Sequence, residues 1–185
     1  MGHYRTGLLG LLLAISGCTG TGDFPFYAEI PQWVTHPSHP SGLAATDCEP
    51  RGLNFALDQE LAANGARKEL GKHLQNRTEA MEKAYQNELA GDGETDRSTL
   101  SFDEVAPGVI SDHLPKAKIA KTGDVRIQGE DHACVMAAFG GQQLKGILDD
   151  LIAASGRQIG EAKRRALLRL LSGSETTQQG RSQAP

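Results

Sequence analysis

Three cysteines are among the reactive residues of this 185-residue sequence, and the first of them follows a distinctive segment. Residues 1–6 carry one charged side chain, Arg5, and residues 7–15 contain no polar side chain. Small residues then precede the cysteine in Ile15-Ser16-Gly17-Cys18. A short basic segment, an apolar segment and small residues at a cleavage point form a bacterial secretory signal. A cysteine directly after that point completes a lipobox, because its sulfur receives a diacylglyceryl group and its new amino group is then acylated.

The alternative interpretations are an ordinary signal peptide with a coincidental cysteine and a short buried helix. The lipobox is favoured because all its parts occur in the right order. We therefore predict that residues 1–17 are removed as a lipoprotein signal peptide and that Cys18 carries the acyl chains. Two or more acyl chains anchor a protein stably, since each buried methylene contributes about 0.8 kcal/mol, whereas one chain holds only marginally.

The residue after the lipidated cysteine bears on where such a protein is sorted. It is Thr19 and not Asp. By resemblance to bacterial lipoproteins, an Asp at this position signals retention at the inner membrane, so Thr19 favours the periplasmic side of the outer membrane. No apolar run in the sequence reaches the length of about 18 residues that a membrane-spanning helix needs.

The two other cysteines, Cys48 and Cys134, would form a pair in an oxidising periplasm. The disulfide would close a loop of 85 intervening residues and contribute about 2–4 kcal/mol on the chain-entropy estimate. The alternative is two reduced thiols that pack like small apolar side chains. The six histidines are scattered and show no ligand spacing of a structural zinc site, so we expect neither a metal site nor a cofactor.

The length and net charge of the chain limit the kind of protein that it can be. Without its signal peptide the chain has 168 residues (185 minus 17), enough for one domain with its own core. Arg5 is the only charged residue of the signal, so 18 of the 19 basic residues stand against 23 acidic residues, a net charge of −5. An acidic balance of this kind argues against a dedicated nucleic-acid-binding protein.

The first residues of the mature chain predict a tether. Four of the eight prolines fall in residues 18–41, which are also rich in glycine. Phe24, Phe26 and Tyr27 would rest either at the membrane interface or on the domain. Trp33 is a possible surface contact, and packing against the domain is the favoured interpretation for this single tryptophan.

Hydrophobic periodicity then predicts one domain over residues 42–171 and a disordered tail over residues 172–185. The first element is expected to be a helix over residues 51–74, with an apolar face that includes Leu53, Leu57 and Leu61. Asn76 would cap a continuation that is helix rather than strand, and a short helix would follow the capping box at Ser101. Strands are then expected over residues 117–122, 124–128 and 132–139, and helices over residues 144–156 and 158–171. A long N-terminal helix, a small antiparallel sheet and C-terminal helices give a two-layer α+β fold.

Several short motifs carry a family resemblance. They are Pro31-Gln32-Trp33-Val34, Gly42-Leu43-Ala44-Ala45-Thr46-Asp47-Cys48, the helix segment Ala62-Ala63-Asn64-Gly65-Ala66-Arg67-Lys68-Glu69-Leu70, and Ala133-Cys134-Val135-Met136-Ala137. With the lipobox, they resemble the Lpp-twenty family of outer-membrane lipoproteins over residues 31–156. The resemblance implies a small α+β periplasmic domain without known catalytic residues. Some members take part in flagellar structures and motility, and others are surface antigens or uncharacterised.

The sequence offers little that resembles an enzyme. It lacks a G-x-S-x-G nucleophile elbow, an H-E-x-x-H zinc motif and a phosphate-binding glycine loop. Asp149 and Asp150 are adjacent on a helix and therefore point in different directions. The last helix has a basic side that would meet lipid phosphates or an acidic partner, or would simply be solvated; its residues are Arg157, Lys163, Arg164, Arg165 and Arg169.

We therefore expect a non-catalytic lipoprotein of the outer membrane that acts through contacts with unidentified envelope proteins, as an accessory to motility, flagellar or envelope assembly. The alternatives are a regulator of a peptidoglycan-synthesis or trafficking machine and an envelope hydrolase with an unrecognised site. Tethering itself supports a binding role, because it raises the effective concentration of the domain for other components of the same surface.

Overall fold

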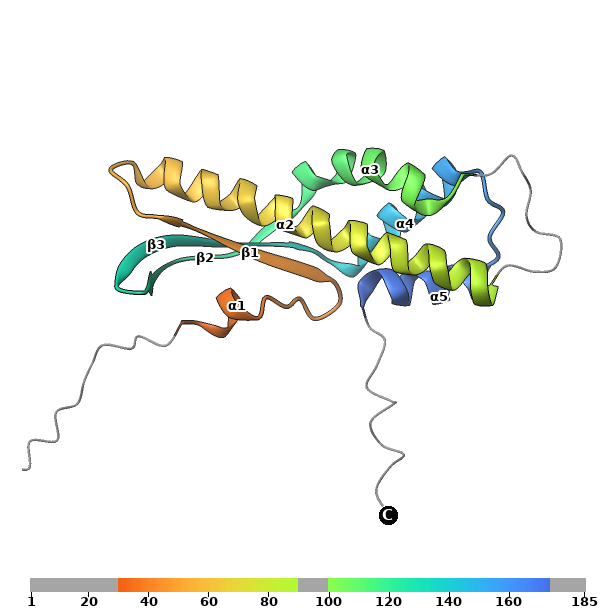
Figure 1. Cartoon of the computed structure of the whole chain (residues 1–185), viewed down its shortest axis with the longest axis horizontal. Helices are drawn as coiled ribbons and strands as arrows, with labels where there is room; N and C mark the ends of the chain where they lie inside the picture. Colours follow the sequence, from red (N-terminus) through yellow and green to blue (C-terminus); the bar gives the residue numbers. More distant parts are fainter. Residues whose placement is uncertain (1–29, 90–99, 174–185) are drawn as a thin grey trace, which may run out of the picture.

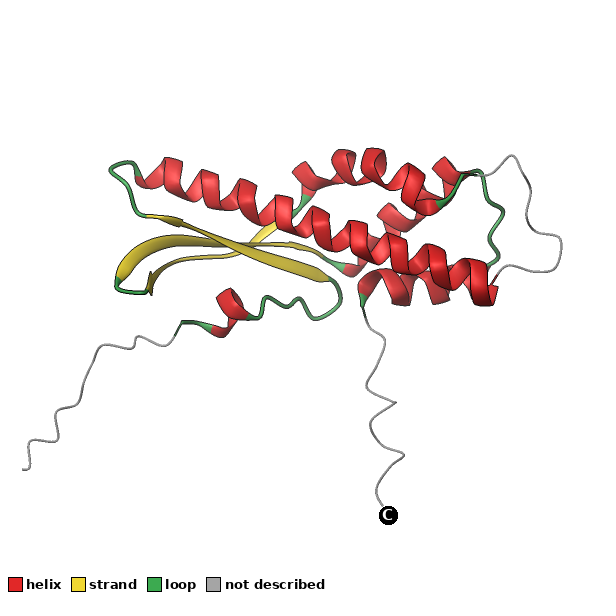
Figure 2. Cartoon of the chain, viewed as in Figure 1, coloured by secondary structure: helices red, strands yellow, loops and turns green. Residues whose placement is uncertain are grey.

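A computed structural model describes residues 30–89 and 100–173 of the chain. Helices and a three-stranded antiparallel sheet make up these residues, which confirms the α+β class (Figures 1 and 2). The strands are β1 (Leu43–Pro50), β2 (Lys118–Ile127) and β3 (Glu130–Phe139). The helices are α1 (Gln32–Thr35), α2 (Phe55–Ala84), α3 (Phe102–His113), α4 (Gly141–Ser155) and α5 (Glu161–Ser172), with a π-helical turn at Tyr85–Leu89 and a 3₁₀ turn at Leu114–Lys116.

The sheet has the strand order β1-β3-β2, so β3 is central. Its run from Ala133 to Phe139 is buried throughout, as expected for a strand that is paired on both edges and covered on both faces. β2 is one continuous strand and not the two predicted, because Gly123, where the break was expected, pairs with Cys134 of β3. A register shift in this pairing lies between Ile119 and Lys121.

β1 was not predicted from the sequence. Residues 43–50 mix small, polar and charged side chains and show no strong alternation, yet they pair with β3 from Leu43↔Phe139 to Pro50↔His132. The strand exists because one of its faces meets the long helix α2: Leu43 and Ala45 point into the main core, and Asp47 lies against Gly65. This strand forms one edge of the sheet and was not among the three strands predicted over residues 117–139.

Helix α2 is a single helix of 30 residues. Asn54 caps it by accepting a hydrogen bond from the Leu57 N–H at 3.3 Å, so it begins later than predicted. It runs through Asn76, where a break was expected, and the helical interpretation of the following residues is confirmed. Two glycines of α2 are points of close packing: a Cβ at Gly65 would overlap the Asp47 carboxylate, and one at Gly71 would lie 3.1 Å from Leu114.

The two halves of α2 have different surroundings (Figure 1). The first half lies on the sheet through Ala62 and Ala66, and its opposite side is uncovered. The second half is packed by α3 and α5 as well, so residues on several of its sides are buried, among them Gly71, Leu74, Thr78, Met81 and Glu82. This is why the buried residues of α2 do not follow one face along the whole helix.

Helix α3 is longer than its sequence suggested. Ser101 and Glu104 form the predicted capping box, with the Ser101 N–H donating to Glu104 Oε2 at 2.8 Å. The helix was expected to be short, but it continues past Pro107 to His113. The carbonyl that loses its partner belongs to Asp103, which is exposed, while Phe102, Ala106 and Ile110 anchor the opposite side in the core.

The C-terminal helices agree with their predictions within a few residues. Helix α4 ends at Gly156, whose φ of 73° is in the left-handed region that favours glycine. Helix α5 ends in the same way at Gly173, and residues 174–185 of the predicted tail lie outside the described part of the chain. Among the described residues no helix is both long enough and apolar enough to span a bilayer.

Candidate functional site

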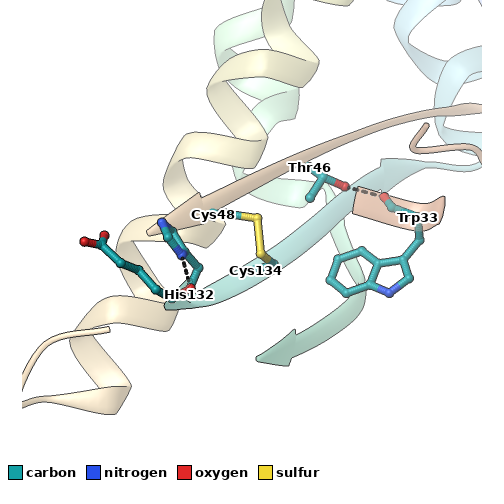
Figure 3. The surroundings of a disulfide bond; sticks show 6 residues. Trp33, Thr46, Cys48, His132 and Cys134 are labelled. Atoms are coloured by element: carbon teal, nitrogen blue, oxygen red, sulfur yellow. Dashed lines mark hydrogen bonds between the residues drawn. A yellow bond between two sulfur atoms is a disulfide. The ribbon is translucent and has the colours of Figure 1, made fainter. Parts of the chain in front are cut away.

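The candidate residues identified from the sequence lie in different parts of the structure. Cys18, with the tether up to residue 29, lies outside the described residues. Residues 30–41 were assigned to the tether but belong partly to the domain, because α1 packs on the sheet. Trp33 contacts the small cluster of Ala44, Met136 and Ala138. Its carbonyl accepts a hydrogen bond from Thr46 Oγ1 at 2.9 Å (Figure 3). Trp33 is therefore a packing residue on the sheet.

Cys48 and Cys134 form a disulfide bond (Figure 3). The two cysteines are directly opposite each other in the pairing of β1 with β3. Because neighbouring side chains alternate between the faces of a strand and Asp47 faces α2, the bond lies on the face that carries Trp33. It cross-links the central strand to the edge strand that the sequence did not predict.

The basic residues near the last helix do not form one surface. Arg164 pairs with Asp149, which also accepts a bond from Lys145 at 2.8 Å; these two cations hold the pKa of Asp149 below its usual range. Asp150, the neighbouring carboxylate, bonds to His113 Nε2 at 2.8 Å. The predicted contact residues thus divide: Arg164 is used within the fold, Lys163 is half-buried, and Arg165 and Arg169 are exposed.

Arg157 is not on the basic side at all but in a buried cluster. Its guanidinium donates two hydrogen bonds to the Glu82 carboxylate, at 2.7 and 2.9 Å, and lies 4.5 Å from the ring centres of Tyr85 and Phe102. The Phe102 N–H and Gln86 Nε2 complete the shell of Glu82 at 2.8 and 2.7 Å. Burial raises the pKa of Glu82, but these bonds lower it more, so the carboxylate is held ionised.

This cluster joins three elements that are far apart in the sequence: the end of α2, the start of α3 and the turn after α4. Both oxygens of the Glu82 carboxylate accept hydrogen bonds, so the cluster provides a structural connection and not an open reaction centre. Among the described residues, no group of three or more His, Cys, Asp or Glu side chains is arranged to hold a metal ion.

One surface feature is an apolar stripe on the uncovered half of α2, which we define as Leu53, Leu57 and Leu61. Leu57 and Leu61 are one turn apart and 49% and 46% exposed, while Leu53 is fully exposed in the turn before the helix. The Gly52 N–H donates to Asp58 Oδ2 at 2.8 Å, which fixes that turn. These leucines were predicted to face the core, and that prediction is wrong because the sheet contacts the opposite side of α2.

A second feature is a cleft of about 830 Å³ between the residue 39–42 loop, the first turn of α4 and one side of α5. Arg165 and Arg169, one helical turn apart, line it together with the apolar side chains of Pro40, Leu144 and Leu168. The sequence identified both arginines but not the cleft, because one of its walls is the residue 39–42 loop, more than a hundred positions away.

Comparisons with protein-family models, with curated proteins and with solved structures find no match. The features that bear on function are therefore the sequence motifs, the apolar stripe on α2 and the cleft beside α5.

Proposed function

We propose that this protein is a lipoprotein anchored through Cys18 to the periplasmic side of the outer membrane, and that it works without catalysis by binding another envelope protein. The observation that carries this proposal is the apolar stripe of Leu53, Leu57 and Leu61. Contiguous exposed leucines on a fixed scaffold are typical of protein-interaction surfaces, because solvent exposure of such a group is unfavourable unless a partner covers it. The specific process that we propose is motility or envelope assembly.

A long helix that is buried on one side and apolar on the other suits this role. Helix α2 is held by the sheet along its first half and by two helices along its second half, so its outer side is presented rigidly. A rigid surface loses little conformational entropy on binding. Regulation of a peptidoglycan-synthesis or trafficking machine remains the alternative proposal for the same surface, and the phenotype of a deletion strain separates the two.

The interaction can be tested by placing a photo-crosslinking amino acid at position 57 or 61 in living cells. We expect each position to yield a defined adduct with an envelope protein, and Leu57→Glu with Leu61→Glu to abolish the adduct formed from a crosslinker at position 60. The matched control is Ala153→Glu with Ala154→Glu, which adds the same charge to exposed positions of α4. Adducts that persist in the leucine variant would contradict the proposal.

A deletion strain tests the proposed process. Loss of swimming with normal growth and cell shape is expected for a motility accessory, whereas altered shape or sensitivity to wall stress would indicate the peptidoglycan alternative. Complementation with the Leu57→Glu, Leu61→Glu variant should fail to restore swimming, and complementation with the alanine-to-glutamate control should succeed. Turnover of an envelope substrate by the purified protein would instead favour a hydrolase.

The anchor leads to a separate prediction. Cys18→Ser removes the sulfur that receives the diacylglyceryl group, so the variant should lose its acyl chains, which contribute about 0.8 kcal/mol per buried methylene. Mass spectrometry of the purified protein and fractionation of the cells measure the outcome. If the serine variant were still acylated, or if the native protein kept residues 1–17 in the cytosol, the proposed location would be wrong.

A further inference from the structure

The cleft beside α5 has the chemical character of a site for an anion. Arg165 and Arg169 are exposed and lie on the same side of the helix, and no Asp or Glu occurs among the described residues that line the cleft. The first turn of α4 also borders it at Gly141, and that turn contains no acidic residue. The first N–H groups of a helix have no partner within the helix and carry partial positive charge, so they add to the field of the arginines.

Two of the carbonyl groups in the last turn of α5 already accept hydrogen bonds. The last turn of α5 borders the cleft, and its carbonyl groups would repel an anion if they were exposed. The Gly173 N–H bonds to the Leu170 carbonyl at 3.2 Å, and the Ser172 hydroxyl bonds to the Arg169 carbonyl at 3.1 Å. The cleft therefore offers mainly donors and positive charge to a ligand.

Glycines bring the backbone close to this space. Gly42, Gly141 and Gly173 line the cleft and have no side chain to fill it. A Cβ at Gly42 would overlap the Phe139 carbonyl, and one at Gly141 would lie 3.1 Å from the Ser41 carbonyl, so larger residues would shift the walls. The close approach of the loop to the end of β3 and to the start of α4 thus favours glycine at both positions.

The rest of the cleft is apolar, and its volume exceeds what a small inorganic anion needs. Pro40, Leu144 and Leu168 form the apolar wall beside the arginines. About 830 Å³ is within the range of about 300–1,000 Å³ that is usual for small-molecule sites. A ligand that satisfies both walls has an anionic head and an apolar body. Within residues 30–89 and 100–173 no strand lines the cleft, so this part of the chain offers it no edge to which an extended peptide could add.

We propose that this cleft binds a lipid with a net negative, phosphate-bearing headgroup, with the headgroup at Arg165 and Arg169 and the first part of an acyl chain against Leu168. The choice of a lipid among anionic amphiphiles rests on the proposed membrane location, which places such lipids next to the domain. The site is distinct from the apolar stripe on α2, so one protein would bind a lipid and a protein partner at once.

The test uses the full acylated chain in dodecyl maltoside, titrated with dioctanoyl phosphatidylglycerol or dioctanoyl phosphatidylcholine and followed by native mass spectrometry. We expect at least tenfold tighter binding of phosphatidylglycerol, since both lipids share their chains and differ in net charge. Arg165→Gln with Arg169→Gln should weaken phosphatidylglycerol at least tenfold and leave phosphatidylcholine nearly unchanged. The matched control, Lys121→Gln with Arg126→Gln, removes two exposed cations from β2 and should bind like the wild type.

A lysine variant and a competition with inorganic phosphate complete the test. Arg165→Lys with Arg169→Lys retains the charge and should recover most of the binding if the glutamine variant is folded but inactive. Inorganic phosphate in tenfold excess should not displace the lipid, because it cannot use the apolar wall. Equal affinity for the two lipids, wild-type binding by the glutamine variant, or complete displacement by phosphate would each overturn the proposal.

The location of the protein is measured separately. Cells that produce the Arg165→Gln, Arg169→Gln variant should retain it in the outer-membrane fraction, since Cys18 anchors it. If the cleft did not bind lipid, the proposal that Cys18 anchors the protein would still stand. If Cys18 were not acylated, the titration would still measure whether the cleft binds lipid.

Discussion

Arg157→Met should lower the free energy of unfolding by about 3–5 kcal/mol, the cost typical of removing one partner from a buried ion pair. The Arg157 side chain is 11% exposed and its partner Glu82 is 6% exposed. Methionine fills much of the same space between Tyr85 and Phe102, but it leaves the Glu82 carboxylate buried without its counter-charge. Urea unfolding monitored by circular dichroism measures the change.

Controls separate charge from packing. Arg126→Met removes an arginine whose ion pair with Asp131 is exposed, and it should change the free energy of unfolding by no more than about 0.5 kcal/mol. The double variant Glu82→Gln, Arg157→Met should recover part of the lost stability because no buried charge remains unpaired. A single variant as stable as the wild type would show that the cluster does not hold α2, α3 and the turn after α4 together.

The same pair predicts a pH dependence. The folded-state pKa of Glu82 is lowered, so its ionised form stabilises the fold above the ordinary glutamate pKa of about 4.3. That contribution is lost as the pH falls through the folded-state pKa. In Arg157→Met the unpaired carboxylate becomes easier to protonate, so the stability gap between variant and wild type should narrow when the pH falls from 7 to below about 4. A gap that stays constant would contradict this account.

Loss of the Cys48–Cys134 disulfide is expected to have the second largest effect. Replacing both cysteines with alanine should lower the free energy of unfolding by about 2–4 kcal/mol, because the bond closes a loop with 85 residues between its ends and restricts the unfolded chain. That loop contains all of α2, α3 and β2. Urea unfolding of the wild type with and without reductant should reproduce the same difference.

Cys18→Ala is the matched control for this prediction, since it removes a cysteine that is not part of the disulfide. It should leave the stability of the domain unchanged. On non-reducing gels the wild type should migrate faster than its reduced form, and Cys48→Ser should abolish the shift. Free reaction of both thiols with a maleimide in the folded wild type would rule the bond out.

Local patterns were sufficient for elements whose burial follows a simple period. The capping box at Ser101, the strand over residues 132–139 and the end of α4 at Gly156 were all predicted from the sequence, because caps and buried strands leave local signals. The helices do not break at Asn76 or end at Pro107, because tertiary packing stabilises both helices through these positions. β1 was missed because its stability comes from pairing with a strand more than eighty residues away.

The same distinction applies to the candidate sites. The lipobox around Cys18 is contiguous in sequence, so its chemistry can be predicted without a fold, and the cysteine count alone suggested the pairing of Cys48 with Cys134. Tertiary structure alone decided which leucines of α2 are exposed, that Arg157 is buried against Glu82, and that Arg165 and Arg169 border a cleft. These properties depend on which side of a helix its neighbours cover, and those neighbours come from distant parts of the chain.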